Sequence, residues 1–268
     1  MPDAATLLAA YDAQLRTDAE TPSALAVTRV GPLRLVTFAG GRGFVTYRTL
    51  DDADGTPVDA VRVRELVAAA ADHFRADPAF AQAEWKTRGH DHAPGLHDAL
   101  LEHGFEPEEQ ESIMLGEAAG LVADVPLPAG VTLRRVTEEA DVRAMARMVD
   151  EVFGDPRDVE PILARLRNES AREDGMQVWV AEADGVIVSA GRLEPVPSTE
   201  FAGIWGGATR PEWRGQGIYR ALTSARAREA LRLGRRYLHS DSTEYSRPIL
   251  ERSGLLRAST TTPYVWHR

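Results

Sequence analysis

Residues 210–222 of the chain read RPEWRGQGIYRAL. A segment rich in small residues, FAGIWGGAT at 201–209, precedes this stretch as a predicted strand, and a predicted helix follows it. A loop that opens directly into a helix presents unpaired backbone N–H groups and the positive end of the helix dipole. Gly215 and Gly217 would let the backbone approach a phosphate closely, and Arg214 adds a fixed positive charge. The stretch therefore predicts an anion site.

The spacing of this loop differs from that of the two common phosphate-binding loops. A Walker loop ends in Gly-Lys-Ser/Thr, and a dinucleotide-binding fold needs three spaced glycines early in a β-α-β unit. Neither pattern occurs in residues 210–222. On these residues alone, a turn that is merely shaped by two glycines is as good an explanation as a phosphate site.

Hydrophobic periodicity and turn residues divide the chain into two series of elements. The first half predicts a helix, three strands, a helix, a strand, a helix and a strand, at 3–16, 24–30, 33–39, 44–50, 58–76, 81–88, 93–103 and 111–115. The second half predicts a strand, two helices, a hairpin, a strand, a helix, a strand, a helix and one or two strands, at 131–136, 138–153, 158–170, 176–194, 201–209, 218–233, 235–241, 246–253 and from 255 onward. Asp184-Gly185 suits the two-residue turn of the hairpin.

The two series end alike, which indicates a diverged internal repeat. Asp91 and Gly104 bracket a helix in the first half, and Asp241 and Gly254 bracket one in the second, at an offset of about 150 residues. Such a repeat predicts two similar α/β domains packed side by side. Proline and glycine gather between the halves. We expect domains at 1–120 and 131–268, joined by a linker at 121–130.

Composition limits the class of protein further. The chain has 268 residues, 43% of them hydrophobic, no cysteine and a formal net charge of -10. The absence of cysteine rules out disulfides and favours a reducing compartment. Neither a signal peptide nor a membrane span is recognisable, so we expect a cytoplasmic protein. The acidic surface argues against nucleic acid as a partner and is compatible with cationic amines.

Residues 131–268 resemble the GNAT family of N-acetyltransferases. The acyl-CoA loop of that family follows the pattern Arg/Gln-x-x-Gly-x-Gly/Ala before a helix, and this chain has Arg214-Gly215-Gln216-Gly217-Ile218-Tyr219. The flanking ATRPEW and SRPILERSGL segments fit the family as well. The resemblance implies a tandem α/β protein in which each GNAT-like domain has a mixed, mostly antiparallel sheet flanked by helices. The first domain resembles the family only weakly and is expected to be degenerate.

The resemblance also implies roles for individual backbone groups. The N–H groups from Gln216 to Tyr219 would hold the pyrophosphate of acetyl-CoA. The strand 204–209, with Ala208 and Thr209, would splay from its neighbour and hold the thioester carbonyl. Tyr219 departs from the pattern, because the family usually has glycine or alanine at this position; its side chain could turn aside and leave its N–H available.

The first half lacks an equivalent anion loop. Asp51, Asp52 and Asp54 precede its long helix and would repel a pyrophosphate. We therefore expect this domain to bind no CoA, and either to wall the acceptor cleft or to act as a scaffold. His90 and His92 flank an aspartate at a strand end without further ligands in the sequence, so no metal site is expected.

Acetyl transfer to an amine needs an unprotonated nucleophile, donors for the oxyanion and a proton for the leaving thiolate. Many family members use a tyrosine four residues before the final glycine, where this chain has Leu250. Tyr245 is the first substitute. Candidate bases are Asp241, His239 and Glu200, although each has a structural alternative as a turn cap, a packed strand residue or a solvated strand end.

The sequence thus predicts an acyltransferase of the EC 2.3.1 type that acetylates an amine by direct attack in a ternary complex. The alternatives are an acyl-CoA-binding regulatory pseudoenzyme, favoured by Leu250, and a structural protein with a vestigial loop. The acceptor is a small-molecule or peptide amine, contacted by loops at 155–158 and 195–199. Either a monomer or a homodimer is compatible with the sequence.

Overall fold

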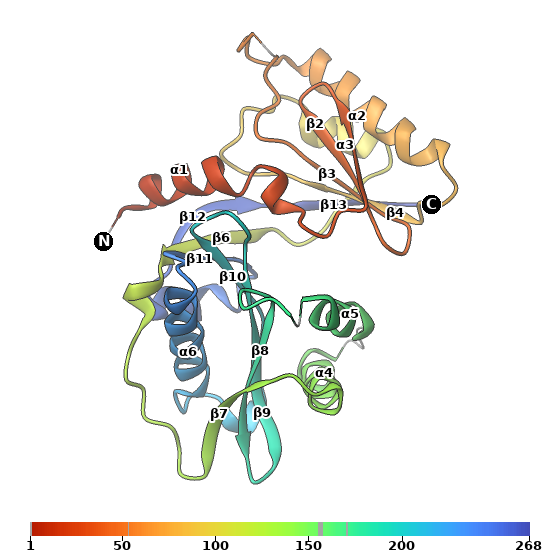
Figure 1. Ribbon diagram of the computed structural model, residues 1–268. Coiled ribbons are helices and arrows are strands. Elements are labelled where there is room, and N and C mark those ends of the chain that lie inside the picture. Colours follow the sequence, from red (N-terminus) through yellow and green to blue (C-terminus); the bar gives the residue numbers. More distant parts are fainter. Residues whose placement is uncertain (1, 53, 155–157, 170) are drawn as a thin grey trace. The chain divides into compact units, whose positions relative to one another are not determined.

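The computed structural model describes residues 2–52, 54–154, 158–169 and 171–268. It has the expected α/β architecture, with two mixed sheets flanked by helices (Figure 1). The α-helices are α1 Ala4–Gln14, α2 Ala60–Ala76, α3 Leu96–Glu102, α4 Glu139–Phe153, α5 Glu160–Glu169, α6 Ile218–Arg232 and α7 Arg247–Ser253. The strands are β1 Ala26–Val30, β2 Leu33–Phe38, β3 Arg42–Thr46, β4 Gln82–Lys86, β5 Glu106–Pro107, β6 Glu111–Glu117, β7 Val131–Val136, β8 Gln177–Ala183, β9 Val186–Pro195, β10 Phe201–Thr209, β11 Tyr237–Ser242, β12 Leu256–Thr261 and β13 Pro263–His267.

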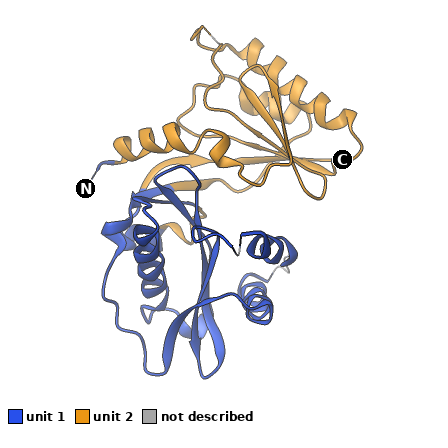
Figure 2. Cartoon of the chain, in the orientation of Figure 1, with its two compact units in different colours: residues 1–3, 114–240, 248–256 blue, residues 4–113, 241–247, 257–268 orange. Residues whose placement is uncertain are grey.

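The chain divides into two compact units that are not contiguous in sequence (Figure 2). Unit 1 holds residues 1–3, 114–240 and 248–256, and unit 2 holds residues 4–113, 241–247 and 257–268. Each unit therefore takes short segments from the other half of the sequence. As a functional division, domains at 1–120 and 131–268 with a linker at 121–130 stay a prediction.

Unit 2 is built on a six-stranded sheet of order β1-β2-β3-β4-β13-β5. β1, β2 and β3 pair antiparallel, and β3 pairs with β4 in parallel. The apolar stripe of α2, which includes Val63, Val67 and Phe74, packs with α3 and with Trp85 of β4 in one core. Burying such apolar surface is the main force that holds the helices on the sheet.

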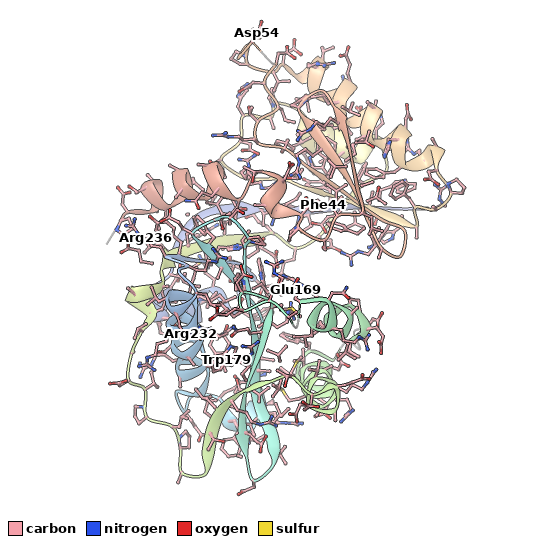
Figure 3. All side chains as sticks on the ribbon, in the orientation of Figure 1. Phe44, Asp54, Glu169, Trp179, Arg232 and Arg236 are labelled. Atoms are coloured by element: carbon pink, nitrogen blue, oxygen red, sulfur yellow. The ribbon has the colours of Figure 1, made fainter. Side chains whose placement is uncertain are left out.

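Unit 1 contains the adjacent strands β8, β9 and β10 of a sheet of order β12-β6-β11-β10-β9-β8-β7. α6 lies on one side of these strands and α4 with α5 on the other (Figure 1). The predicted hairpin turn is confirmed, because Asp184 and Gly185 both have positive φ, 49° and 77°. Arg232 in the last turn of α6 pairs with Glu229 and Glu173, which suits the negative end of the helix dipole (Figure 3).

The internal repeat is visible in the strand directions. β8 and β9 pair antiparallel, β9 and β10 pair antiparallel, and β10 pairs with β11 in parallel, as β1, β2, β3 and β4 do in unit 2. The next position differs in origin. Beside β4 lies β13, from the end of the chain, whereas β6, from the first half, lies beside β11. The two sheets have thus exchanged a strand.

The segment 121–130 between the two halves is hydrogen-bonded to α6. The Ser224 hydroxyl accepts a hydrogen bond from the Ala123 N–H at 2.9 Å and donates one to the Ala123 carbonyl at 2.8 Å. Val125 reaches the start of α6, close to Gly217. Among the described residues, no helix combines the length and the apolar character needed to cross a membrane.

Candidate active site

The RPEWRGQGIYRAL stretch folds as a short 3-10 turn, Pro211–Trp213, followed by a loop that ends at the first turn of α6. Arg214 is exposed, and its Nε donates to the carbonyl of Thr209 at the end of β10, 3.0 Å away. This bond holds the arginine beside the loop and uses only one of its nitrogens. The loop is therefore positively charged and open to solvent.

Both glycines of the loop adopt backbone conformations that disfavour other residues. Gly215 has φ of 74° and Gly217 has φ of 81°. A Cβ placed on Gly215 would meet no atom within 4 Å, so the space in front of this residue is empty. A Cβ on Gly217 would lie 3.2 Å from the Val125 side chain. Gly215 and Gly217 thus form a backbone surface without side chains, the glycine surface.

The start of α6 supplies the hydrogen-bond donors of this surface. The first helical bond runs from Ala221 N–H to Gly217 O at 2.9 Å, so the N–H groups of residues 218–220 have no acceptor within the helix. Ile218 is 1% exposed and packs in a core with Val188 and Ala181, which fixes the first turn. The position of these donors is thus set by the fold before any ligand arrives.

The Tyr219 side chain turns away from the loop, as we expected for a tyrosine at a position where the family usually has glycine or alanine. Its hydroxyl lies against Gly207 of β10, where an added Cβ would be 2.4 Å from the phenol oxygen. The guanidinium of Arg226, about two turns further along α6, lies 5.7 Å from its ring centroid. Burial lowers the pKa of Arg226, and Tyr219 partly opposes this effect. The tyrosine therefore packs under β10 and does not block the glycine surface.

β10 separates from β11 beside this loop. The two strands pair in parallel only from Phe201↔Tyr237 to Gly203↔His239, and β10 then continues to Thr209. Its pairing with β9 shifts register between Trp205 and Ala208, and Gly206 within the shift has φ of 61°. A bulge of this kind breaks the ladder and frees backbone N–H groups. The pairing of β10 with β11 therefore ends at Gly203, as the predicted splay of residues 204–209 requires.

His239 is the candidate base that lies nearest to the splayed strand. Its half-buried ring meets Trp205 edge to face, with ring centroids 5.3 Å apart, and contacts Phe201 at 6.0 Å in the same manner. An imidazole is suited to accept a proton near neutral pH. A role as a packed strand residue and a role as a base are both compatible with this position.

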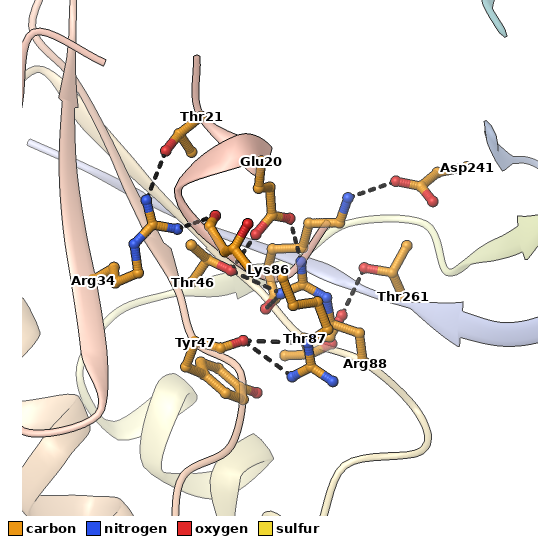
Figure 4. Close-up of polar contacts among 12 residues, drawn as sticks. Glu20, Thr21, Arg34, Thr46, Tyr47, Lys86, Thr87, Arg88, Asp241 and Thr261 are labelled. Carbon is orange, nitrogen blue, oxygen red and sulfur yellow. Dashed lines mark hydrogen bonds and ion pairs between the residues drawn. The ribbon is translucent and has the colours of Figure 1, made fainter. Parts of the chain in front are cut away.

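Asp241 is held in an ion pair within unit 2. Its Oδ2 lies 2.6 Å from Nζ of Lys86, the one lysine of the sequence, and the Asp241 side chain is 9% exposed (Figure 4). The charge of Asp241 raises the pKa of Lys86 despite the opposing effect of burial. The Asp241 carboxylate is thus engaged by a buried ammonium within unit 2, and this contact favours a structural role.

The remaining candidates lie in dissimilar surroundings. Tyr245 is 88% exposed in the turn before α7, and Glu200 is exposed at the start of β10. Leu250 is 2% exposed and belongs to the core formed with Leu238 and Leu255. Of the loops expected to contact the acceptor, residues 155–157 lie outside the described residues. The catalytic roles of Asp241, Tyr245, His239 and Glu200 stay predictions.

A charged cluster on β9 was not identified from the sequence. Arg192 and Glu194 form an ion pair at 2.9 Å, and Arg165 of α5 reaches the same carboxylate at 2.5 Å. Burial would raise the pKa of Glu194, but the two arginines outweigh it and lower the pKa below its ordinary value. The alternation of charged and apolar residues in GRLEP, 191–195, was the available signal.

Comparison with known proteins agrees with this geometry. Residues 142–254 match the model of the Acetyltransferase (GNAT) family. No curated protein matches the sequence. The structure is similar to a GCN5-related N-acetyltransferase from Kribbella flavida, with a TM-score of 0.66 and 19% identity over 99% of this chain and 96% of that one. It is also similar to a tandem GNAT protein from the clavulanic acid biosynthesis pathway, with a TM-score of 0.62 and 16% identity over 89% of this chain and 79% of that one.

Residues 142–254 are therefore similar to the GNAT acetyltransferases, a family that carries out acyl-CoA-dependent acetyl transfer. At these identities the solved structures show the fold alone. They extend the GNAT-like fold to the first half, because the Kribbella flavida structure covers nearly the whole chain. The suspected tandem architecture is confirmed.

Proposed function

We propose that this protein binds acetyl-CoA at Arg214–Tyr219 and transfers the acetyl group to a primary amine by direct attack in a ternary complex. The single observation that carries the proposal is the glycine surface at the start of α6. Gly215 and Gly217 leave it open, the N–H groups of residues 218–220 have no helical acceptor, and Arg214 stands beside it. A pyrophosphate fits such a surface because both charge and donors favour an anion.

The splayed strand would supply the second requirement of the reaction. Acetyl-CoA provides a thioester that is activated for attack. The bulge at Gly206 and Gly207 would supply backbone N–H groups, because it lies in the part of β10 that is not paired with β11. Fixed donors of this kind stabilise the oxyanion formed when the amine nitrogen bonds to the carbonyl carbon.

Proton transfer completes the proposal. His239 would accept the proton that the amine loses, directly or through water, since Asp241 is engaged with Lys86. Collapse of the adduct breaks the carbon–sulfur bond and releases a thiolate, which takes up a proton; we retain Tyr245 as its donor. No covalent enzyme intermediate is required, and the expected product is an amide.

Calorimetric titration of acetyl-CoA tests the binding step. The wild-type protein should bind one equivalent, and a variant with Arg214→Glu and Gly217→Val should lose binding, because it reverses the charge and fills the glycine surface. Gly234→Val and Arg64→Glu are matched controls: Gly234, just after α6, also has positive φ, and Arg64 is an exposed residue of α2 in unit 2. A wild-type protein that binds no acetyl-CoA would contradict the proposal, as would equal binding by the double variant.

A further inference from the structure

The charged cluster on β9 lies on the face of the sheet that is turned away from α6. Gly191 faces α6, since an added Cβ would lie 2.5 Å from the Arg226 guanidinium. Successive side chains on a strand point to opposite faces, so Arg192 points to the other face. It is paired in register with Trp205 of β10, whose ring meets His239. Arg192 therefore shares a face with the candidate base and the splayed strand.

A row of charged groups fixes Arg192 in place. Its Nε donates to Glu194 Oε1 at 2.9 Å, while the other oxygen of Glu194 accepts from Arg165. Arg165 also donates to Glu169, and Glu169 accepts from the Met176 N–H at 2.6 Å (Figure 3 labels Glu169). Each carboxylate in the row is hydrogen-bonded on both sides, so the guanidinium of Arg192 is oriented by its supports before a ligand binds.

The outer edge of the Arg192 guanidinium is available to a ligand. Within the described part of the chain, Glu194 is its one hydrogen-bonding partner and is reached through Nε, which leaves the Nη1 and Nη2 fork unused. The side chain is 25% exposed. A Cβ on Gly206 would lie only 2.6 Å from Nη1, so the fork lies directly on the bulge of β10. A planar fork of this kind matches the two oxygens of a carboxylate.

We propose that Arg192 determines substrate specificity by binding a carboxylate of the substrate through its Nη1 and Nη2 atoms beside the bulge of β10. The inference rests on the proposed function and narrows it to an acid-bearing substrate. The carboxylate belongs either to the acceptor, as in an amino acid, or to the acyl chain, as in a dicarboxylic acyl-CoA. Both sources present the same chemistry to Arg192.

Two titration series separate these sources. In the first, the CoA-bound protein is titrated with N-acetylphenylalanine and with its neutral amide, which represent the product of amino-acid acetylation. In the second, the free protein is titrated with succinyl-CoA and with acetyl-CoA. The variants are Arg192→Lys, which keeps the charge but loses the fork, and Arg192→Gln. Arg147→Gln on α4 is the control for loss of one arginine elsewhere in the unit.

The expected result is a preference for the acid in one series that weakens roughly 10- to 100-fold in both Arg192 variants, the range for hydrogen bonds to a charged group. Affinity for the neutral ligand of that series should stay within about twofold, which a misfolded variant would not show. Acid and neutral ligands that bind equally well in both series would overturn the inference. Acetyl-CoA binding by the wild type, measured separately, reports on the proposed function alone.

Discussion

The N-termini of α2 and α6 occupy equivalent places in the repeat but are capped differently. The side chain of Asp59 caps α2 by accepting from the Arg62 N–H at 2.8 Å. The cap position of α6 is Gly217, which has no side chain to offer. A carboxylate of the protein itself therefore caps the helix in the first half, whereas no side chain caps it in the second. One residue type at one position separates a capped helix end from the surface that we propose to bind acetyl-CoA.

A second pair of equivalent residues does not differ. Leu100 in α3 and Leu250 in α7 stand at the repeat offset, are 0% and 2% exposed, and belong to the cores of their units. Because the half without an anion loop also has leucine here, this position serves packing in both halves. Leu250, which stands where many family members have a tyrosine, is thus a core residue of unit 1.

The largest effect on stability should come from truncating either of these two equivalent leucines. Leu100→Ala and Leu250→Ala each remove a buried side chain, and each should lower the free energy of unfolding by about 2–5 kcal/mol. Chemical denaturation of the two variants measures it. If Leu250 were a functional position with little role in packing, Leu250→Ala would cost much less than Leu100→Ala, and the equivalence of the two sites would fail.

Gly217→Asp gives α6 the kind of cap that α2 has. The new carboxylate would stand where the pyrophosphate is proposed to bind, so the affinity for acetyl-CoA should fall about tenfold or more, the effect of roughly 1.4 kcal/mol of repulsion and displacement. Calorimetric titration measures the change. Asp59→Ala is the partner variant: it should leave acetyl-CoA binding unchanged and cost about 1 kcal/mol of stability. Unaltered binding by Gly217→Asp would show that the ligand does not reach this cap.

A further prediction concerns the half-buried carboxylate of Glu111 in unit 2. Burial and the charge of Asp241 raise the pKa of Glu111 from 4.5 to about 7, although Lys86 opposes them. A group whose pKa is raised by folding takes up protons on folding between these values, so its favourable contribution is lost as the pH rises from about 4.5 to about 7. Glu111→Gln removes the titration. The variant should gain stability relative to wild type across that window and hold a constant difference above it, as measured by denaturation at several pH values. Parallel pH profiles for the two proteins would refute this account.

Local patterns were sufficient to predict most elements and the glycine-containing turn before α6. The loop glycines, the Asp184-Gly185 turn and the long helices follow from residues adjacent in sequence, where propensity and backbone sterics decide. The contacts of Asp241 with Lys86, and of Glu194 with Arg165, join residues far apart in the chain. No periodicity reports such pairs, because they depend on sheet order and on which strand lies beside which.

The same limit explains why the exchange of β6 and β13 could not be predicted. Pairing of β13 with β4 joins Pro263 to Lys86, and nothing in either segment specifies so distant a partner. During synthesis on the ribosome, β4 emerges long before residues 263–267 exist. Until β13 is made, β4 therefore has an unpaired edge. A nascent chain that stalled before β13 would expose that edge to other proteins.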